Sequence, residues 1–210
     1  MKKTAIFLVF FVLVALLNAQ NPALSVPKFK GIEITGTVDQ FGSKLTNQGF
    51  KFLGNEDYGS VYMGSFAGIN DCLVILVPVV NSKDIASVNV IIGLTLSDYD
   101  VYTYESWDKL LNDYNNLKDL LTQKYGEPTE DNAGFAEDAS TGNSFLKLLS
   151  VKEGQCEYYS IWGDSDVDKM IVELAIKGGK NMGYEAAVIL LRYWNVDKTR
   201  DSQKEILDDL

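Results

Sequence analysis

The spacing of apolar side chains changes its period along the first half of the chain. Residues 37–49 have helical spacing that ends at Gly49. Thr37 and Gln40 have the spacing of a capping box, which predicts where this helix begins. The period then falls to two. This alternation predicts strands at residues 50–53, 60–66, 72–80 and 87–94, separated by turn-forming segments.

The same order of patterns returns in the second half. Ser106 is a predicted N-cap for a longer helix that ends at Gly126, because apolar side chains recur between them every three or four residues. The polar segment 129–142 predicts a loop, and the tail, 197–210, predicts a short acidic helix. Period-two patterns predict strands at residues 144–151, 156–162, 169–177 and 185–194.

The two halves also align in sequence. Residues 41–49 fall on residues 117–125 at an offset of 76, and Cys72 falls on Cys156 at an offset of 84. The eight extra residues fit within the polar segment 129–142. This alignment favours a tandem duplication over two unrelated helices in one α+β protein.

We therefore predict an α+β fold of two tandem repeats, residues 27–98 and 99–196. Each repeat is expected to be one helix followed by a three- to four-stranded antiparallel meander. Both helices are expected to lie on one face of the sheet.

The first residues have the composition of an export signal. Lys2 and Lys3 form a positive start, residues 6–17 are apolar, and Ala19 is a small residue suited to cleavage. The apolar run is shorter than the roughly 20 residues that a spanning helix needs, which favours a cleaved signal at 1–19 over a membrane anchor. No cysteine near residue 20 offers lipid attachment. We expect an exported protein, periplasmic or extracellular, with no stable membrane anchor after cleavage.

The net charge argues against one class of partner. The chain carries 19 basic and 29 acidic side chains, a net charge of −10, and loss of Lys2 and Lys3 would leave 17 − 29 = −12. Nucleic acids and anionic membranes recruit proteins with an excess of Lys and Arg. We expect no nucleic acid partner, and the acidic balance also agrees with simple solubility.

No catalytic or cofactor signature is complete. The chain has no histidine, which removes the base of Ser-His-Asp and Cys-His mechanisms and the commonest zinc ligand. Ser106 and Lys109 match an S-x-x-K pattern without its companion motifs, and residues 164–168 match the start of a calcium loop without its Gly and Glu. Residues 177–183 lack the setting of a phosphate loop. We expect an N-cap, an acidic turn and a hairpin loop at these places, no cofactor and no enzymatic activity.

Two groups of residues remain as candidate functional features. Cys72 and Cys156 are either a disulfide, which would stabilise an exported chain by about 4 to 5 kcal/mol, or two buried free thiols. Four large aromatics lie between the halves and form either a binding surface or part of the core. These aromatics are Tyr99, Tyr102, Tyr104 and Trp107.

Three segments carry a resemblance to known proteins. They are FKGIEITGTVDQF at 29–41, YNNLKDLLTQKYGEP at 114–128 and CEYYSI at 156–161, and they resemble an uncharacterised family of exported Bacteroidetes proteins. The helix-then-meander repeat is similar to the β-lactamase-inhibitor-protein fold and to the small outer-membrane assembly lipoproteins that share it. The resemblance implies the fold and transfers no catalytic residue.

These observations favour a non-catalytic role. We expect the protein to bind another protein or an envelope component through an exposed sheet face or the segment between the halves. Two alternatives stay open. One is an envelope glycan hydrolase with a carboxylate pair in a deep cleft, and the other is a periplasmic sensor with a closed apolar pocket for a small ligand.

Overall fold

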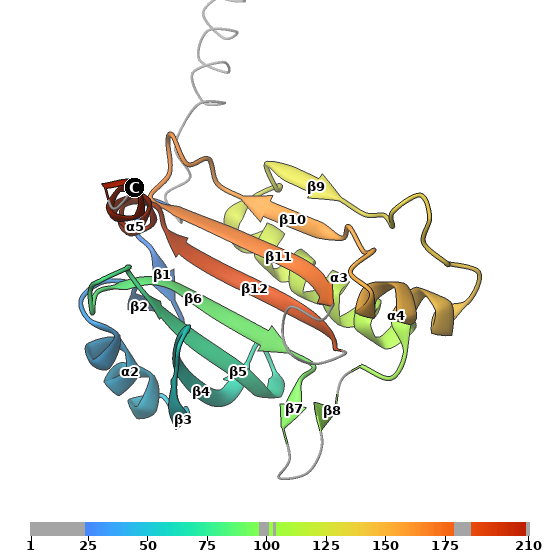
Figure 1. Ribbon diagram of the computed structural model, residues 1–210, viewed down its shortest axis with the longest axis horizontal. Helices are drawn as coiled ribbons and strands as arrows, with labels where there is room; N and C mark the ends of the chain where they lie inside the picture. Colours follow the sequence, from blue (N-terminus) through green and yellow to red (C-terminus); the bar gives the residue numbers. More distant parts are fainter. Residues whose placement is uncertain (1–23, 97–100, 103, 179–185, 209–210) are drawn as a thin grey trace, which may run out of the picture.

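An eight-stranded antiparallel sheet forms the frame of the molecule (Figure 1). The computed structural model describes residues 24–96, 101–102, 104–178 and 186–208. The strand order is β3-β4-β5-β6-β12-β11-β10-β9. The strands are β3 (Lys51–Glu56), β4 (Gly59–Phe66), β5 (Ile69–Pro78), β6 (Ile85–Ile92), β9 (Glu130–Asn132), β10 (Tyr159–Trp162), β11 (Met170–Gly178) and β12 (Ala187–Asn195).

Helices and two small ribbons complete the described part of the chain, which confirms the α+β class. None of its helices combines the length and the apolarity of a bilayer span. The predicted signal at 1–19 lies outside the described residues. The helices are α2 (Val38–Asn47), α3 (Trp107–Tyr125), α4 (Ser144–Lys152) and α5 (Val196–Asp208). The ribbons pair β1 (Lys28–Phe29) with β2 (Ile32–Glu33), and β7 (Thr95–Leu96) with β8 (Val101–Tyr102).

The predicted starts of α2 and α3 are confirmed. The Thr37 hydroxyl accepts the Gln40 N–H at 3.3 Å, and the Gln40 side chain accepts the Thr37 N–H at 3.1 Å. This reciprocal pair satisfies two backbone donors that a helix start leaves without partners. Ser106 accepts the Lys109 N–H at 3.3 Å and caps α3 in the same way.

The prediction of a strand at residues 144–151 is wrong, because this segment forms α4. Asn143 caps the helix by accepting the Leu146 N–H at 2.9 Å. Phe145 is 73% exposed while Val151 is fully buried. Apolar residues therefore occupy both sides of α4, and this obscures its helical period.

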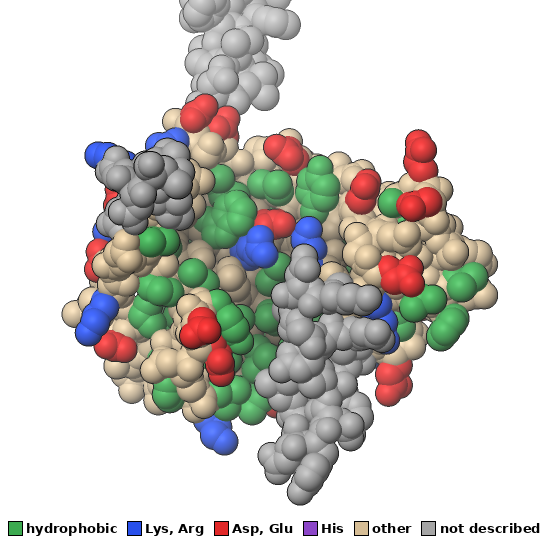
Figure 2. Space-filling view, viewed as in Figure 1, with side chains coloured by type: hydrophobic (Ala, Val, Ile, Leu, Met, Phe, Trp, Pro, Cys, Tyr) green, Lys and Arg blue, Asp and Glu red, His purple; other side chains and the backbone are tan. Residues whose placement is uncertain are grey.

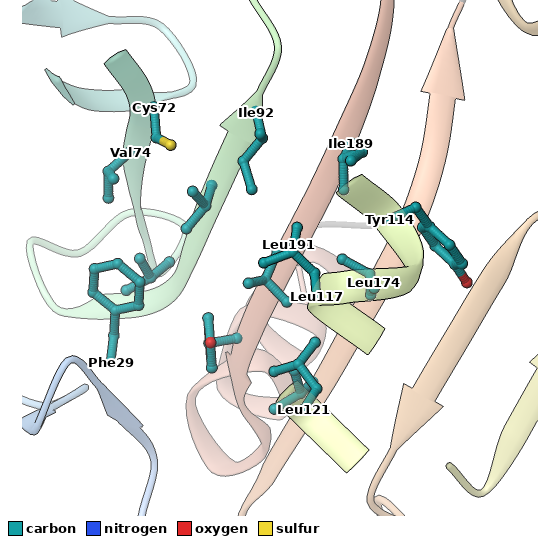
Figure 3. Packing of buried hydrophobic residues seen from close by; sticks show 14 of the residues in the cluster. Phe29, Cys72, Val74, Ile92, Tyr114, Leu117, Leu121, Leu174, Ile189 and Leu191 are labelled. Atoms are coloured by element: carbon teal, nitrogen blue, oxygen red, sulfur yellow. The ribbon is translucent and has the colours of Figure 1, made fainter. Parts of the chain in front are cut away.

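The two sides of the sheet differ. Figures 1 and 2 view one side, and in Figure 1 α3 lies behind β10 and β11. The hidden side carries the main core, in which Leu117 and Leu121 of α3 face Leu191 of β12 (Figure 3). Each such fully buried side chain contributes about 1.5 to 3 kcal/mol. The main core therefore lies on the hidden side of the sheet, and the viewed side is the candidate for a binding surface.

The C-terminal helix α5 joins segments that are far apart in the sequence. Asn195, just before it, donates from Nδ2 to the Ile34 carbonyl at 2.9 Å. Lys198 Nζ lies 2.8 Å from an Asp84 carboxylate oxygen at the turn between β5 and β6. These contacts fix the end of β12 against the first half of the chain.

Candidate functional site

The side of the sheet opposite the main core forms a second apolar surface, which we call the open face. Residues paired directly across antiparallel strands share a face, so the strand register defines it. In the described part of the chain, no helix adds a side chain to the buried cluster on this side. Its cross-strand rows are Val61-Ile75-Asn89-Arg192-Glu173-Ile161, Met63-Leu73-Ile91-Leu190-Ala175-Tyr159, Val77-Ser87-Trp194-Ile171 and Val188-Lys177.

The open face changes from buried to half-buried across its width. Leu73 and Ile91 are only 5% and 4% exposed, whereas Met63, Val77 and Trp194 are half-buried. Figure 2 shows hydrophobic side chains spread over this side of the sheet, with charged side chains of both signs among them. The described chain therefore leaves apolar side chains partly uncovered around a charged centre, an arrangement typical of binding surfaces.

Arg192 lies at this charged centre. It pairs with Asn89 of β6 on one side and Glu173 of β11 on the other. Its Nη1 donates to Glu173 Oε2 at 3.3 Å, and its guanidinium carbon lies 5.9 Å from the centroid of the Trp194 ring. The Glu173 side chain is 12% exposed and the Arg192 side chain 35%. The cation is thus the more accessible member of the ion pair.

Two polar atoms at the centre of the open face are buried without partners. They are Nε of Arg192, which is a donor, and Oδ1 of Asn89, which is an acceptor. A buried polar atom without a hydrogen bond costs about 1 to 3 kcal/mol. Such unpartnered atoms are rare in a native fold and require an explanation. A role of this region in binding is one explanation.

For two of the four aromatics, the core alternative holds rather than the binding surface. Tyr104 and Trp107 are only 6% and 3% exposed. The Tyr104 ring occupies space left by Gly93, where an added Cβ would meet the ring at 2.0 Å. The Trp107 ring packs edge-on against Tyr158, with their centroids 5.2 Å apart. Both rings anchor the start of α3 in the core.

The other two aromatics cannot be assigned to a surface. Tyr99 lies outside the described residues, and so does the side chain of Tyr102, whose backbone belongs to β8. The Tyr104 hydroxyl donates to Asp113 Oδ2 at 2.9 Å. Burial, and then this hydrogen bond to Asp113, raise the pKa of Tyr104. Its hydroxyl therefore serves as a fixed donor in the fold.

The disulfide alternative for Cys72 and Cys156 does not hold, since both thiols are free. Cys72 belongs to β5, while Cys156 pairs with Phe135 beside β10. Four strand spacings separate β5 from β10, which is roughly 19 Å and well beyond the roughly 7 Å Cα limit of a disulfide. The alternative of two buried free thiols holds fully for Cys72, whereas Cys156 is free but only half-buried.

The weaker sequence motifs have structural roles. Lys109 Nζ lies 3.0 Å from Asp113 Oδ2, so it forms an ion pair within α3. Asp164 Oδ1 accepts the Asp166 N–H at 2.8 Å, and Asp168 Oδ2 accepts the Asp164 N–H at 3.0 Å, which makes 164–168 a self-capped turn. The predicted hairpin loop at 177–183 lies mostly outside the described residues.

Two adjoining depressions lie at one end of the sheet. The larger has a volume of about 570 Å³ and is lined by Tyr58, Val80 and Lys83 among others. Asp39, Glu56 and other residues line the second, of about 370 Å³. In the described residues, no group of three or more acidic or thiol side chains is placed to hold a metal ion. The first depression lies at a strand end and the turn after it, and the second lies between the start of α2 and the ends of β3, β4 and β5.

A chain of polar side chains was not predicted from the sequence. The Tyr114 hydroxyl lies 2.9 Å from Ser160 Oγ, which donates to Asp131 Oδ1 at 2.7 Å. Lys118 Nζ lies 2.6 Å from Asp131 Oδ2. Ser160 is fully buried, whereas Asp131 at the outer end of the chain is partly exposed, and together these side chains link α3, β10 and β9.

The open face was not predicted from the sequence either. Leu190, Arg192 and Trp194 alternate with Leu191 and Tyr193 along β12, and both sets contain large apolar residues, so the sequence does not show which side is open. Comparison with known proteins gives no further guide: no protein-family model, no curated protein and no solved structure matches this chain.

Proposed function

We propose that this is an exported, non-catalytic protein of the cell envelope that binds a protein partner on its open face. The observation that carries the proposal is the group formed by Arg192, Trp194 and Glu173 amid half-buried apolar side chains. Export is supported by the positive start and the apolar run in residues 1–19.

The composition of the open face supports a protein partner. Trp and Arg are the residues most enriched among those that dominate binding energy in protein interfaces. Here they lie against each other, with the guanidinium carbon of Arg192 5.9 Å from the Trp194 ring centroid. Ile171 is the cross-strand partner of Trp194 and Ile161 that of Glu173, and both isoleucines are half-buried. A partner that covers these side chains would bury apolar area and exclude water from the ion pair.

The arrangement of the strands supports the proposed duplication. The first half contributes α2 and then β3 to β6, and the second contributes α3 and then β9 to β12. The strand order runs inward from both edges to the central pair β6 and β12, as two copies related by a two-fold axis would give. Side chains of α2 and α3 belong to one buried cluster, which supports both helices on one face. Under this interpretation α4 is an insertion in the second copy.

Site-directed photo-crosslinking tests the proposed function. A benzoylphenylalanine is placed at Ile171 on the open face, and in a matched control at Phe145, which is 73% exposed on α4. Both proteins are irradiated in the envelope of the organism that makes them, and adducts are identified by mass spectrometry. We expect one defined protein adduct at position 171, lost when Trp194→Ala is added, and none at position 145.

The outcomes separate the proposal from its alternatives. Equal adducts at both positions, or adducts only at position 145, would overturn the open face as the binding surface. Turnover of a glycan substrate by the purified protein would overturn the non-catalytic role, because that reaction requires a carboxylate pair.

A further inference from the structure

We infer that the partner presents an acidic side chain, flanked by apolar ones, to Arg192 on the open face. This inference rests on the proposed function and specifies the chemistry of the partner at that site. It follows from the accessibility of the Arg192–Glu173 pair, from the unused hydrogen-bonding capacity of Arg192, and from the charge of the open face relative to the whole chain.

The accessibility of the ion pair sets the sign of the partner's charge. Glu173 is the buried member, with a side chain 12% exposed, and Arg192 is the accessible one at 35%. A side chain that approaches over Trp194 therefore reaches the guanidinium before it reaches the carboxylate. A carboxylate is the group that matches a guanidinium in both charge and geometry.

Arg192 has hydrogen-bonding capacity that the fold does not use. Glu173 takes one contact from it, Nη1 to Oε2 at 3.3 Å, and Nε is buried without a partner, so an incoming group would reach the outer Nη nitrogens of the guanidinium. A guanidinium carries five N–H donors and can serve two carboxylates at once. Apolar surroundings strengthen a charge-assisted hydrogen bond once a partner has displaced the water.

The charge of the open face agrees with an acidic partner. Its defining rows contain Arg192, Lys177 and Glu173 as charged residues, a local excess of one positive charge. The whole chain, in contrast, has a net charge of −10. Local positive charge on an acidic protein favours encounter with an acidic segment at this surface.

Peptide display tests this inference. The full chain is used to select from a display library of random twelve-residue peptides, with wild type, Arg192→Gln, Trp194→Ala and the exchange Arg192→Glu with Glu173→Arg in parallel. Lys44→Glu on α2 is the matched charge-change control. Far-UV circular dichroism and urea unfolding establish that each variant is folded.

We expect wild type and Lys44→Glu to enrich the same peptides, with Asp or Glu between apolar residues. Arg192→Gln should bind them about 30-fold or more weakly. The exchange variant keeps the ion pair and should enrich Lys or Arg at the same place. Peptides that depend on Trp194 but lack an acidic residue, or that bind Arg192→Gln equally well, would overturn this inference alone. Selection of no Trp194-dependent peptide would overturn the proposed function with it.

Discussion

The hydroxyl of Tyr114 on α3 lies 2.9 Å from the hydroxyl of Ser160 on β10, and both residues are almost completely buried, at 2% and 0% exposed. Ser160 donates its proton to Asp131, because an ionised carboxylate only accepts. Tyr114 must therefore be the donor to Ser160. Burial raises the pKa of Tyr114 to about 12, and this keeps the proton on its oxygen.

This direction predicts unequal effects of removing the two hydroxyls. Tyr114→Phe removes a donor and leaves the bond from Ser160 to Asp131 intact, so it should lower the free energy of unfolding by about 1 kcal/mol. Ser160→Ala leaves the buried Tyr114 donor without a partner and should cost about 2 to 3 kcal/mol. Urea unfolding measures both. The double variant should cost less than the sum, and strict additivity would contradict the shared hydrogen bond.

Asp131 makes the stability of the fold depend on acid pH. Partial burial raises the pKa of this carboxyl, but hydrogen bonds from Lys118 and Ser160 outweigh it, so the pKa lies below its usual value. The stabilisation is then fully present above the pKa of the unfolded chain, near 3.9, and is lost as the pH falls through the lower folded value.

We expect the free energy of unfolding of Asp131→Asn to fall less between about pH 4 and pH 2 than that of wild type. Urea unfolding at a series of pH values measures this. The matched control is Asp166→Asn, whose side chain is 89% exposed and which should retain the wild-type slope. A slope for Asp131→Asn that equals that of wild type would exclude the role of the Lys118 and Ser160 bonds.

The two thiols should be unreactive in the folded protein. Burial raises the pKa of both Cys72 and Cys156 to about 11. The thiolate is the reactive form, so labelling by a thiol reagent at pH 8 should be slow in buffer and rapid in urea. Intact mass after mild oxidation should show no internal disulfide. Prompt labelling of either cysteine in the native protein would count against the packing described for it.

The close approach of α2 to the sheet makes Gly42 a sensitive position. A Cβ added there would lie 1.9 Å from the Tyr62 hydroxyl oxygen. Alanine improves helix propensity by about 1 kcal/mol, but overpacking at this contact should cost about 1 to 3 kcal/mol. We expect Gly42→Ala to be destabilising in thermal unfolding. Gly134→Ala, which meets nothing within 4 Å, should be close to neutral.

Local sequence patterns correctly predicted the starts of α2 and α3. The capping box at Thr37 and Gln40 and the cap at Ser106 gave correct helix starts, because each is a contact between residues three apart. The failure at α4 arose from apolar side chains on both sides of a short helix. Strand β9 was missed because Glu130–Asn132 is polar and only three residues long, as edge strands often are.

The residues of the open face are brought together by strand pairing, which local sequence patterns do not predict. Asn89 and Arg192 are cross-strand neighbours although about a hundred residues separate them in the chain. The alternation along β12 shows that Arg192 and Trp194 share a side, but not that Glu173 lies beside them. The disulfide alternative for Cys72 and Cys156 does not hold for the same reason, since residues that align at an offset of 84 in the sequence need not be neighbours in the sheet.

The position of β12 has a consequence for how the chain reaches its folded state. This strand is the last in the sequence, yet it lies between β6 and β11 near the middle of the sheet. Until residues 187–195 emerge from the ribosome, β3 to β6 and β9 to β11 have no strand to join them. Completion of the sheet therefore waits for nearly complete synthesis and proceeds through long-range pairing, which is slow. During that time β6 and β11 remain open edges.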